Sequence, residues 1–217
     1  LNNMNQTNGR LELKQMYNKE FYELVEKYDL SIPQAEGFLT AYIALEGCLN
    51  HPIYGNRWEV ISARRSITRV IYEASLTKIS GFITPAAKRI LVDRLLDGEE
   101  KTKLTTNDHI FSPQTYAHFI CTRWDLFQDN LDNFFREMLV CSITVKCTVE
   151  ENNKFKKYTV NDETTGNVLR LRVPTEKRYK AAGVDKLFNK NTGKYVFDFP
   201  FELSEEFKSF EKEYLLL

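Results

Sequence analysis

The chain has 217 residues, 42% of them hydrophobic, so it can bury a core and does not belong to the disordered class. Its formal net charge of zero argues against indiscriminate binding of nucleic acid. The sequence holds no run of about 18 apolar residues, the length that a membrane span requires. The first residues also lack a basic segment followed by an apolar one, so we expect a cytoplasmic protein.

Helical spacing of apolar residues dominates the first half of the chain. Two helix starts are marked by a hydroxyl residue next to proline, at Ser31 to Pro33 and at Thr84-Pro85. We therefore expect helices over residues 10–28, 31–49, 58–75 and 84–96.

Arg65 and Arg69 lie one turn apart on the third of these helices and could hold phosphate groups. A solvated helix face or an ion pair gives the same pattern. Glu73 follows Arg69 by four residues and could be its partner. Alternatively, Glu73 is a candidate second carboxylate for a metal ion.

The central stretch TTNDHIFSP, residues 105–113, contains an Asp-His pair just before a helix start at Ser112-Pro113. We expect a loop at the positive end of this helix, where anions are favoured and the pKa of an imidazole is lowered. His109 could then act as a general base and Asp108 as a metal ligand or orienting partner. The alternative is an Asx turn at residues 107–108, with His109 merely packed or capping.

At Cys141 the apolar period changes from helical to alternating, which is typical of half-buried antiparallel strands. A turn is expected over 150–154, a hairpin turn at 191–193, a short helix near 177–180 and a terminal helix after Ser204. The predicted strands cover residues 143–149, 155–160, 168–173 and 195–199.

The four cysteines are widely spaced and form no C-x-x-C unit, so a structural zinc site or disulfide framework is disfavoured. We expect reduced, mostly buried thiols at Cys48, Cys121, Cys141 and Cys147.

Basic residues are concentrated in residues 143–194, which hold 12 basic and 6 acidic side chains. If the strands are neighbours, their cations form one basic sheet face that binds phosphate groups. A lysine-rich face that blocks edge pairing gives the same pattern, and so does association with the acidic C-terminal segment. The candidate nucleic-acid-binding residues here are Lys156, Lys157, Arg170, Arg172, Lys177, Arg178 and Lys180, in addition to Arg65 and Arg69.

The stretch TTNDHIFSPQTYAHFI resembles phage-encoded proteins, some of which are site-specific endonucleases. The resemblance covers about 20 residues and implies catalytic and metal-binding roles for Asp108 and His109. The stretch departs from the HNH pattern, because no downstream Asn and His follow at the spacing of a ββα-metal unit. Ser112 also starts a helix where that pattern has a strand.

Together these features predict an α+β fold, with a helical region over 10–140 and a mainly antiparallel β region over 141–217 ending in a helix. The leading hypothesis is a DNA-binding protein with Mg²⁺- or Mn²⁺-dependent endonuclease activity, in which His109 is the base and Asp108 and Glu73 are ligands. The competing hypothesis is a non-catalytic binding or assembly protein that uses the basic sheet and the acidic tail. A homodimer is left open.

Overall fold

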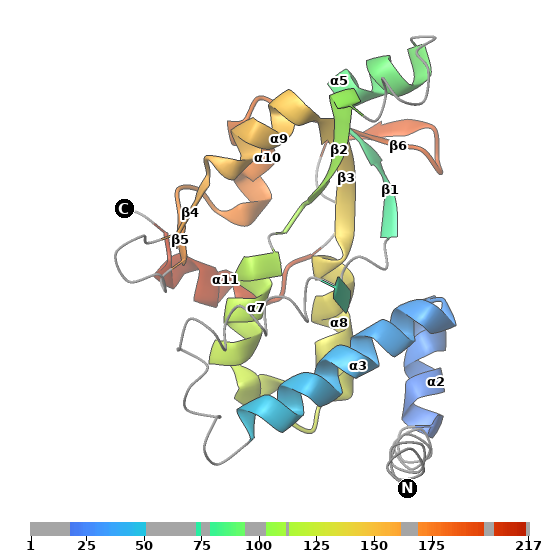
Figure 1. Ribbon diagram of the computed structural model, residues 1–217, viewed down its shortest axis with the longest axis vertical. Coiled ribbons are helices and arrows are strands. Elements are labelled where there is room, and N and C mark those ends of the chain that lie inside the picture. Colours follow the sequence, from blue (N-terminus) through green and yellow to red (C-terminus); the bar gives the residue numbers. More distant parts are fainter. Residues whose placement is uncertain are drawn as a thin grey trace, which may run out of the picture.

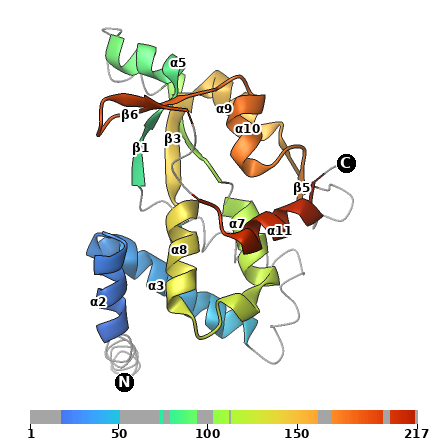
Figure 2. The same ribbon diagram turned by 180° about the vertical axis from the view of Figure 1, so that it is seen from behind.

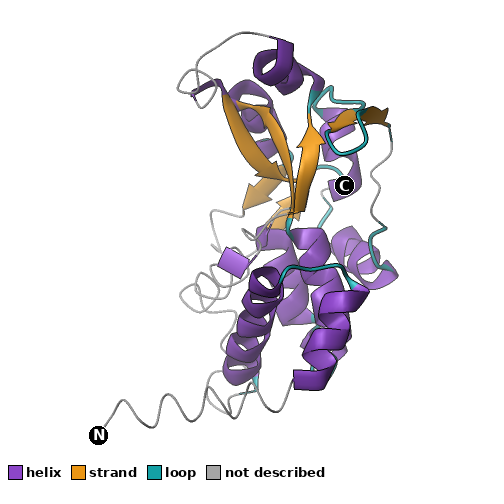
Figure 3. Cartoon of the chain, turned by 90° about the vertical axis from the view of Figure 1, so that its right-hand side faces the viewer, coloured by secondary structure: helices purple, strands orange, loops and turns teal. Residues whose placement is uncertain are grey.

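The computed structural model describes residues 18–50, 73–74, 79–93, 103–111, 113–161, 169–197 and 202–215. These residues form an α+β fold, as predicted, with helices near the N-terminus, a five-stranded sheet and a helix near the C-terminus (Figure 1). Figure 3 shows the strands toward one end of the molecule and the longer helices toward the other. None of the described helices is both long and apolar enough to cross a bilayer.

The N-terminal helices are α2 (Asn18–Lys27) and α3 (Ile32–Leu49). The predicted start at Ser31 is confirmed, because its backbone N–H donates to Gln34 Oε1 at 3.0 Å, as in a capping box. Helix α3 packs against α8 (Leu131–Cys141), and α2 is joined to α8 by an ion pair of 2.7 Å between Lys27 and Asp132. These three helices form one end of the molecule (Figure 2).

Aromatic rings fill the space between α7 (Pro113–Thr122), α8 and α11 (Glu205–Glu213). Tyr116 and Phe207 stack with their ring centroids 4.4 Å apart, and both are fully buried. The terminal helix predicted after Ser204 is therefore part of the core. His118 Nε2 lies 2.9 Å from the hydroxyl of Tyr214 on the same helical layer.

The main sheet has the strand order β2-β3-β1-β6-β7. Three of its four pairings are antiparallel, and only β1 and β3 run parallel. Because β1 and β2 come from the predicted helical region, the sheet joins both halves of the chain. A separate antiparallel pair is formed by β4 (Thr159–Asn161) and β5 (Leu169–Leu171). The strands of the main sheet are β1 (Ile79–Ile83), β2 (Thr105–His109), β3 (Ile143–Thr148), β6 (Leu187–Asn189) and β7 (Lys194–Val196).

The helix predicted from Thr84-Pro85 is confirmed as α5 (Pro85–Lys88), which continues as a π-helical turn over Arg89–Asp93. Thr84 Oγ1 accepts a hydrogen bond from the backbone of Ala87 at 3.2 Å and caps this helix. Most of the helix predicted over 58–75 lies outside the described residues, which include only a short helical piece at 73–74.

The strand predicted over 155–160 is correct only at its end, which belongs to β4, because most of the preceding turn and the start of that strand form one helix, α9 (Val149–Lys156). The helix is started by Thr148, whose Oγ1 accepts from the backbone of Glu151 at 3.1 Å. Glu151 Oε2 in turn accepts from the backbone of Thr148 at 2.9 Å. This reciprocal capping stabilises a helix where the alternating pattern alone indicated a strand. After α9 come strands β4 and β5, then the 3-10 helix η4 (Thr175–Lys177) and helix α10 (Arg178–Ala181).

Candidate functional site

The Asp-His pair lies in strand β2, so the predicted loop is wrong. Asp108 faces Val145 and His109 faces Thr144 across the antiparallel pairing with β3. The pairing with β3 supplies hydrogen-bond partners for the backbone of the polar sequence TTNDH. These tertiary contacts make the segment a strand although its composition is typical of a turn. The buried Ile110 and Phe111 follow His109, and α7 begins at Pro113 as predicted. Ser112 itself lies outside the described residues.

The carboxylate of Asp108 is held by two residues of α10. Arg178 Nη2 and the hydroxyl of Tyr179 both donate to Asp108 Oδ2, each at 2.6 Å. The same guanidinium nitrogen donates to the backbone oxygens of His109 and Ile110, the latter at 3.0 Å. Arg178 thus fixes both the side chain of Asp108 and the backbone that follows it. The other carboxylate oxygen, Oδ1, makes no hydrogen bond to any described residue.

Arg178, a candidate nucleic-acid-binding residue from the sequence, has a buried side chain. Its side chain is 7% exposed and that of Asp108 is 13% exposed. The guanidinium lies over two rings, with its Cζ atom 5.3 Å from the Tyr179 centroid and 5.8 Å from the Phe155 centroid. A buried arginine needs a carboxylate partner, and the sequence did not show that Asp108 supplies it.

Burial controls the proton affinities around this ion pair. It raises the pKa of Asp108 above its ordinary value, and the charge of Arg178 and the hydroxyl of Tyr179 oppose that rise. Burial likewise raises the pKa of Tyr179 well above its ordinary value, and the nearby charge of Asp108 adds to this effect. It also raises the pKa of Cys147 to about 12, so this thiol stays protonated and unreactive at neutral pH.

Strands β2 and β3 and helix α9 form a compact ββα unit, because α9 follows β3 directly and packs against both strands. Along the chain, β3 follows β2 after residues 110–142, which carry α7 and α8. Figures 1 and 2 both show α9 and α10 lying beside each other next to β2. Phe155 of α9 and Tyr179 of α10 join them, with centroids 4.2 Å apart.

Asn152 is a residue of this unit that the sequence analysis missed. It is half-buried and lies three residues before the fully buried Phe155, so both residues are on the buried side of α9. An amide oxygen at this position is a suitable ligand for a hard cation. The capping pattern from Thr148 to Glu151 was the available signal, because it places Asn152 in the first turns of a helix rather than in a turn between strands.

Exposed lysines surround the ends of α9 and α10. The end of α9 is tied to α10 by the hydroxyl of Tyr158, which donates to the backbone oxygen of Ala181 at 2.6 Å. The predicted basic sheet face is therefore replaced by a helical surface, because Lys156 and Lys157 belong to the end of α9. We call this the lysine surface, formed by Lys156, Lys157, Lys177 and Lys180.

The remaining predicted residues are not all placed. Arg65 and Arg69 lie outside the described residues, and of Arg170 only the backbone position in β5 is described. Arg172 is exposed, and its backbone donates to Tyr158 at 2.9 Å, which brings the chain after β5 to the end of α9. Glu73 is exposed in the helical piece 73–74, on an element separate from the ββα unit.

The acidic tail is fixed to the basic segment by contacts that include a buried one at Thr175. Glu211 of α11 is 4% exposed and accepts hydrogen bonds from the backbone and the hydroxyl of Thr175, the former at 2.7 Å. Thr175 begins the turn that leads into α10. The tail therefore helps to position α10 and its Arg178, rather than acting as a free acidic arm.

The described residues contain no group of three or more His, Cys, Asp or Glu side chains placed to hold a metal ion. No protein-family model matches the chain, and neither curated proteins nor solved structures give a significant match.

Proposed function

We propose that the chain is a DNA-binding, divalent-metal-dependent endonuclease that hydrolyses phosphodiester bonds at the ββα unit. The observation that carries this proposal is that only one of the two carboxylate oxygens of Asp108 accepts hydrogen bonds from described residues. Arg178 and Tyr179 hold its Oδ2, whereas Oδ1 has no hydrogen bond within the described part of the chain. Hydrogen bonds to one oxygen of a carboxylate that leave the other available are typical of an oriented metal ligand.

The oxygen donors of the unit suit Mg²⁺ or Mn²⁺, which prefer carboxylate and carbonyl ligands. Asp108 and Asn152 are the residues that would hold the ion, because α9 packs against β2. Glu73, the second ligand expected from the sequence, lies on a separate element. When bound, the ion would polarise a phosphate oxygen and stabilise the charge that develops on it.

His109 is the residue that would accept a proton from the attacking water. Successive residues of a strand point to opposite faces, so Asp108 and His109 leave β2 in different directions. Because His109 is the last residue of β2, a substrate that contacts both side chains would have to lie across the end of the strand. Arg178 sets the position of that end through its bond to the backbone oxygen of His109.

The lysine surface supplies the phosphate contacts that DNA binding requires. Two of its exposed cations lie at the end of α9 and two on η4 and α10 beside the unit, and the charge of Lys156 lowers the pKa of Asp108. Such contacts give affinity that falls steeply with salt and carry little sequence information. The surface therefore supports binding of the DNA backbone near Asp108.

A non-catalytic binding or assembly protein is the second candidate. The observation in its favour is that Arg178 already neutralises Asp108, so the carboxylate has a purely structural partner. In this case the lysine surface would bind DNA or another polyanion without turnover, and His109 would have no chemical role.

Cleavage of a mixed pool of long duplex DNA, incubated with Mg²⁺ or Mn²⁺ and with EDTA, separates the two candidates. The endonuclease proposal predicts cuts that need the metal and disappear in His109→Ala. Asn107→Ala is the matched control, because Asn107 is exposed and lies on the same face of β2 as His109. Equal products with and without metal, or unchanged cleavage by a folded His109→Ala protein, would contradict the proposal.

A further inference from the structure

The β6–β7 hairpin forms the edge of the main sheet opposite to β2. It is anchored to β1 by pairing of Phe82 with Asn189 and by a hydrogen bond of 2.8 Å from the backbone of Lys190 to that of Gly81. Gly193, with φ of 68°, makes the tight turn between the strands, as the sequence predicted. Figure 1 shows the hairpin projecting from the side of the sheet.

One face of this hairpin carries exposed aromatic rings. Tyr195 is 41% exposed and Phe197, the residue after β7, is 62% exposed, and Lys186 lies close to both rings. Phe188 is paired with Tyr195 across the strands, with ring centroids 5.4 Å apart in an edge-on arrangement. Large apolar side chains are normally withdrawn from water, so a row of partly exposed rings marks a contact surface.

Lysines lie directly over these rings. Lys186 Nζ is 5.0 Å from the Tyr195 centroid and 5.9 Å from the Phe197 centroid, and Lys88 Nζ is 5.1 Å from the Phe188 centroid. Each distance is within the range of a cation–π contact. We call Phe188, Tyr195 and Phe197, with Lys88 and Lys186, the aromatic face.

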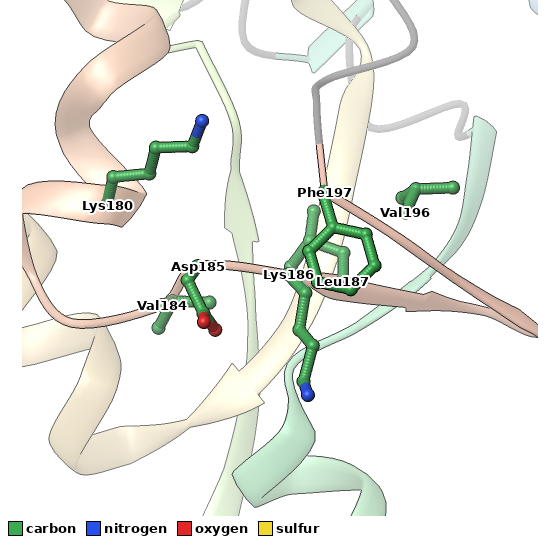
Figure 4. Close-up of a pocket in the computed structure, with 7 residues that line it drawn as sticks. All are labelled: Lys180, Val184, Asp185, Lys186, Leu187, Val196 and Phe197. Atoms are coloured by element: carbon green, nitrogen blue, oxygen red, sulfur yellow. The ribbon is translucent and has the colours of Figure 1, made fainter.

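A shallow pocket connects the aromatic face to α10. It has a volume of about 220 Å³, open solvent included, and its lining includes Asp185 as well as Lys180, Lys186 and Phe197. Figure 4 shows the side chain of Lys186 beside the ring of Phe197, with Lys180 on the neighbouring helix. Lys180 also belongs to the lysine surface, so the pocket links that surface to the hairpin through two lysines and the carboxylate of Asp185.

We infer that the aromatic face binds unpaired bases of single-stranded DNA. Rings supply stacking surfaces for bases, and the lysines beside them supply the charge that phosphates require. A protein partner is less suited to the face, because lysine is depleted in the centre of protein interfaces. The inference takes DNA as the ligand from the proposed function, but it concerns a different surface and needs no metal.

Fluorescence anisotropy in EDTA tests this inference with a labelled 20-nucleotide single strand and with the matching duplex. Stacking contributes about 1–3 kcal/mol per base, so Phe197→Ala and Tyr195→Ala should each weaken single-strand binding by about tenfold. Phe197→Trp should retain it, because the ring is replaced by a larger one. The matched control is Tyr22→Ala, which removes another exposed ring, 55% exposed, from the distant helix α2.

Equal affinity of the Phe197→Ala protein and the wild-type protein for the single strand would overturn the inference. So would a loss of self-association in light scattering with no change in DNA binding, because the face would then be a contact between copies of the chain. The proposed function is tested separately. A chain that binds single strands through Phe197 but does not cut DNA would contradict the endonuclease proposal and leave the inference about the aromatic face intact.

Discussion

The hydroxyl of Tyr179 donates to Oδ2 of Asp108 at 2.6 Å from a position that solvent does not reach. This contact joins α10 to the end of β2, and Arg178 strengthens it from the neighbouring position on the helix. The structure of the candidate site therefore depends on a helix that lies about 70 residues further along the chain. The stability of this link can be measured independently of any activity.

Tyr179→Phe removes the hydroxyl and keeps the ring that packs on Phe155. A hydrogen bond to a charged, largely buried group contributes about 2 kcal/mol, so we expect urea unfolding to show a loss of this size. Tyr22→Phe is the control, because Tyr22 is exposed on α2 and its change should be nearly neutral. A Tyr179→Phe protein as stable as the control would mean that the contact with Asp108 contributes nothing.

Arg178→Met leaves the carboxylate of Asp108 buried without its cation. Removing one member of a buried ion pair costs about 3–5 kcal/mol, and we expect a destabilisation in this range. In a chain that already carries Asp108→Leu, the same change should cost much less, because no charge is left unpaired. Unfolding free energies of the four proteins in this cycle give the coupling, and strictly additive effects would refute the pairing.

Glu137 gives a prediction about pH. It is 2% exposed, and burial raises the pKa of its carboxyl above the ordinary value, with Arg136 and Ser204 opposing the rise. A folded-state pKa above the unfolded value means that the folded chain binds the proton more tightly, so this group favours folding at low pH. Its contribution is lost as the pH rises from the unfolded pKa through the raised folded pKa.

Glu137→Gln removes this titration. We expect the substitution to increase the melting temperature at pH 8, where the wild-type carboxylate is ionised and buried, and to change it little at pH 4. Glu20→Gln, on the exposed side of α2, serves as the comparison. A gain that is the same at both pH values would show that the ionisation of Glu137 does not control stability.

The helix starts at Ser31 and Pro113 and the turn ending at Gly193 could be predicted from the sequence, because each depends on local backbone chemistry. Strand β2 could not, because its polar residues are held by pairing with β3 some forty positions later. Helix α9 was not predicted, although the sequence contains the capping pattern from Thr148 to Glu151, because the alternating apolar residues indicated strands in this region.

The candidate site was predicted in part. Asp108 and His109 were singled out by residue type alone, and the structure places them at the end of one strand. The burial of Arg178 required knowledge of its partner, because a basic residue among lysines looks like any other surface cation. Asn152 became a candidate only when α9 replaced the predicted turn. A long-range ion pair accounts for the burial of Arg178, whereas α9 depends on a local capping pattern.

Binding of Mn²⁺, followed by electron paramagnetic resonance, tests most directly whether the ββα unit is a metal site. The wild-type chain should bind one ion. Asn152→Ala should weaken this binding by about tenfold or more, as expected when a metal ligand is lost. Asn153→Ala changes an exposed neighbour on α9 and should leave the binding unchanged. A wild-type chain that binds no Mn²⁺ at millimolar concentration with DNA present, or an Asn152→Ala protein that binds it equally well, would contradict the account.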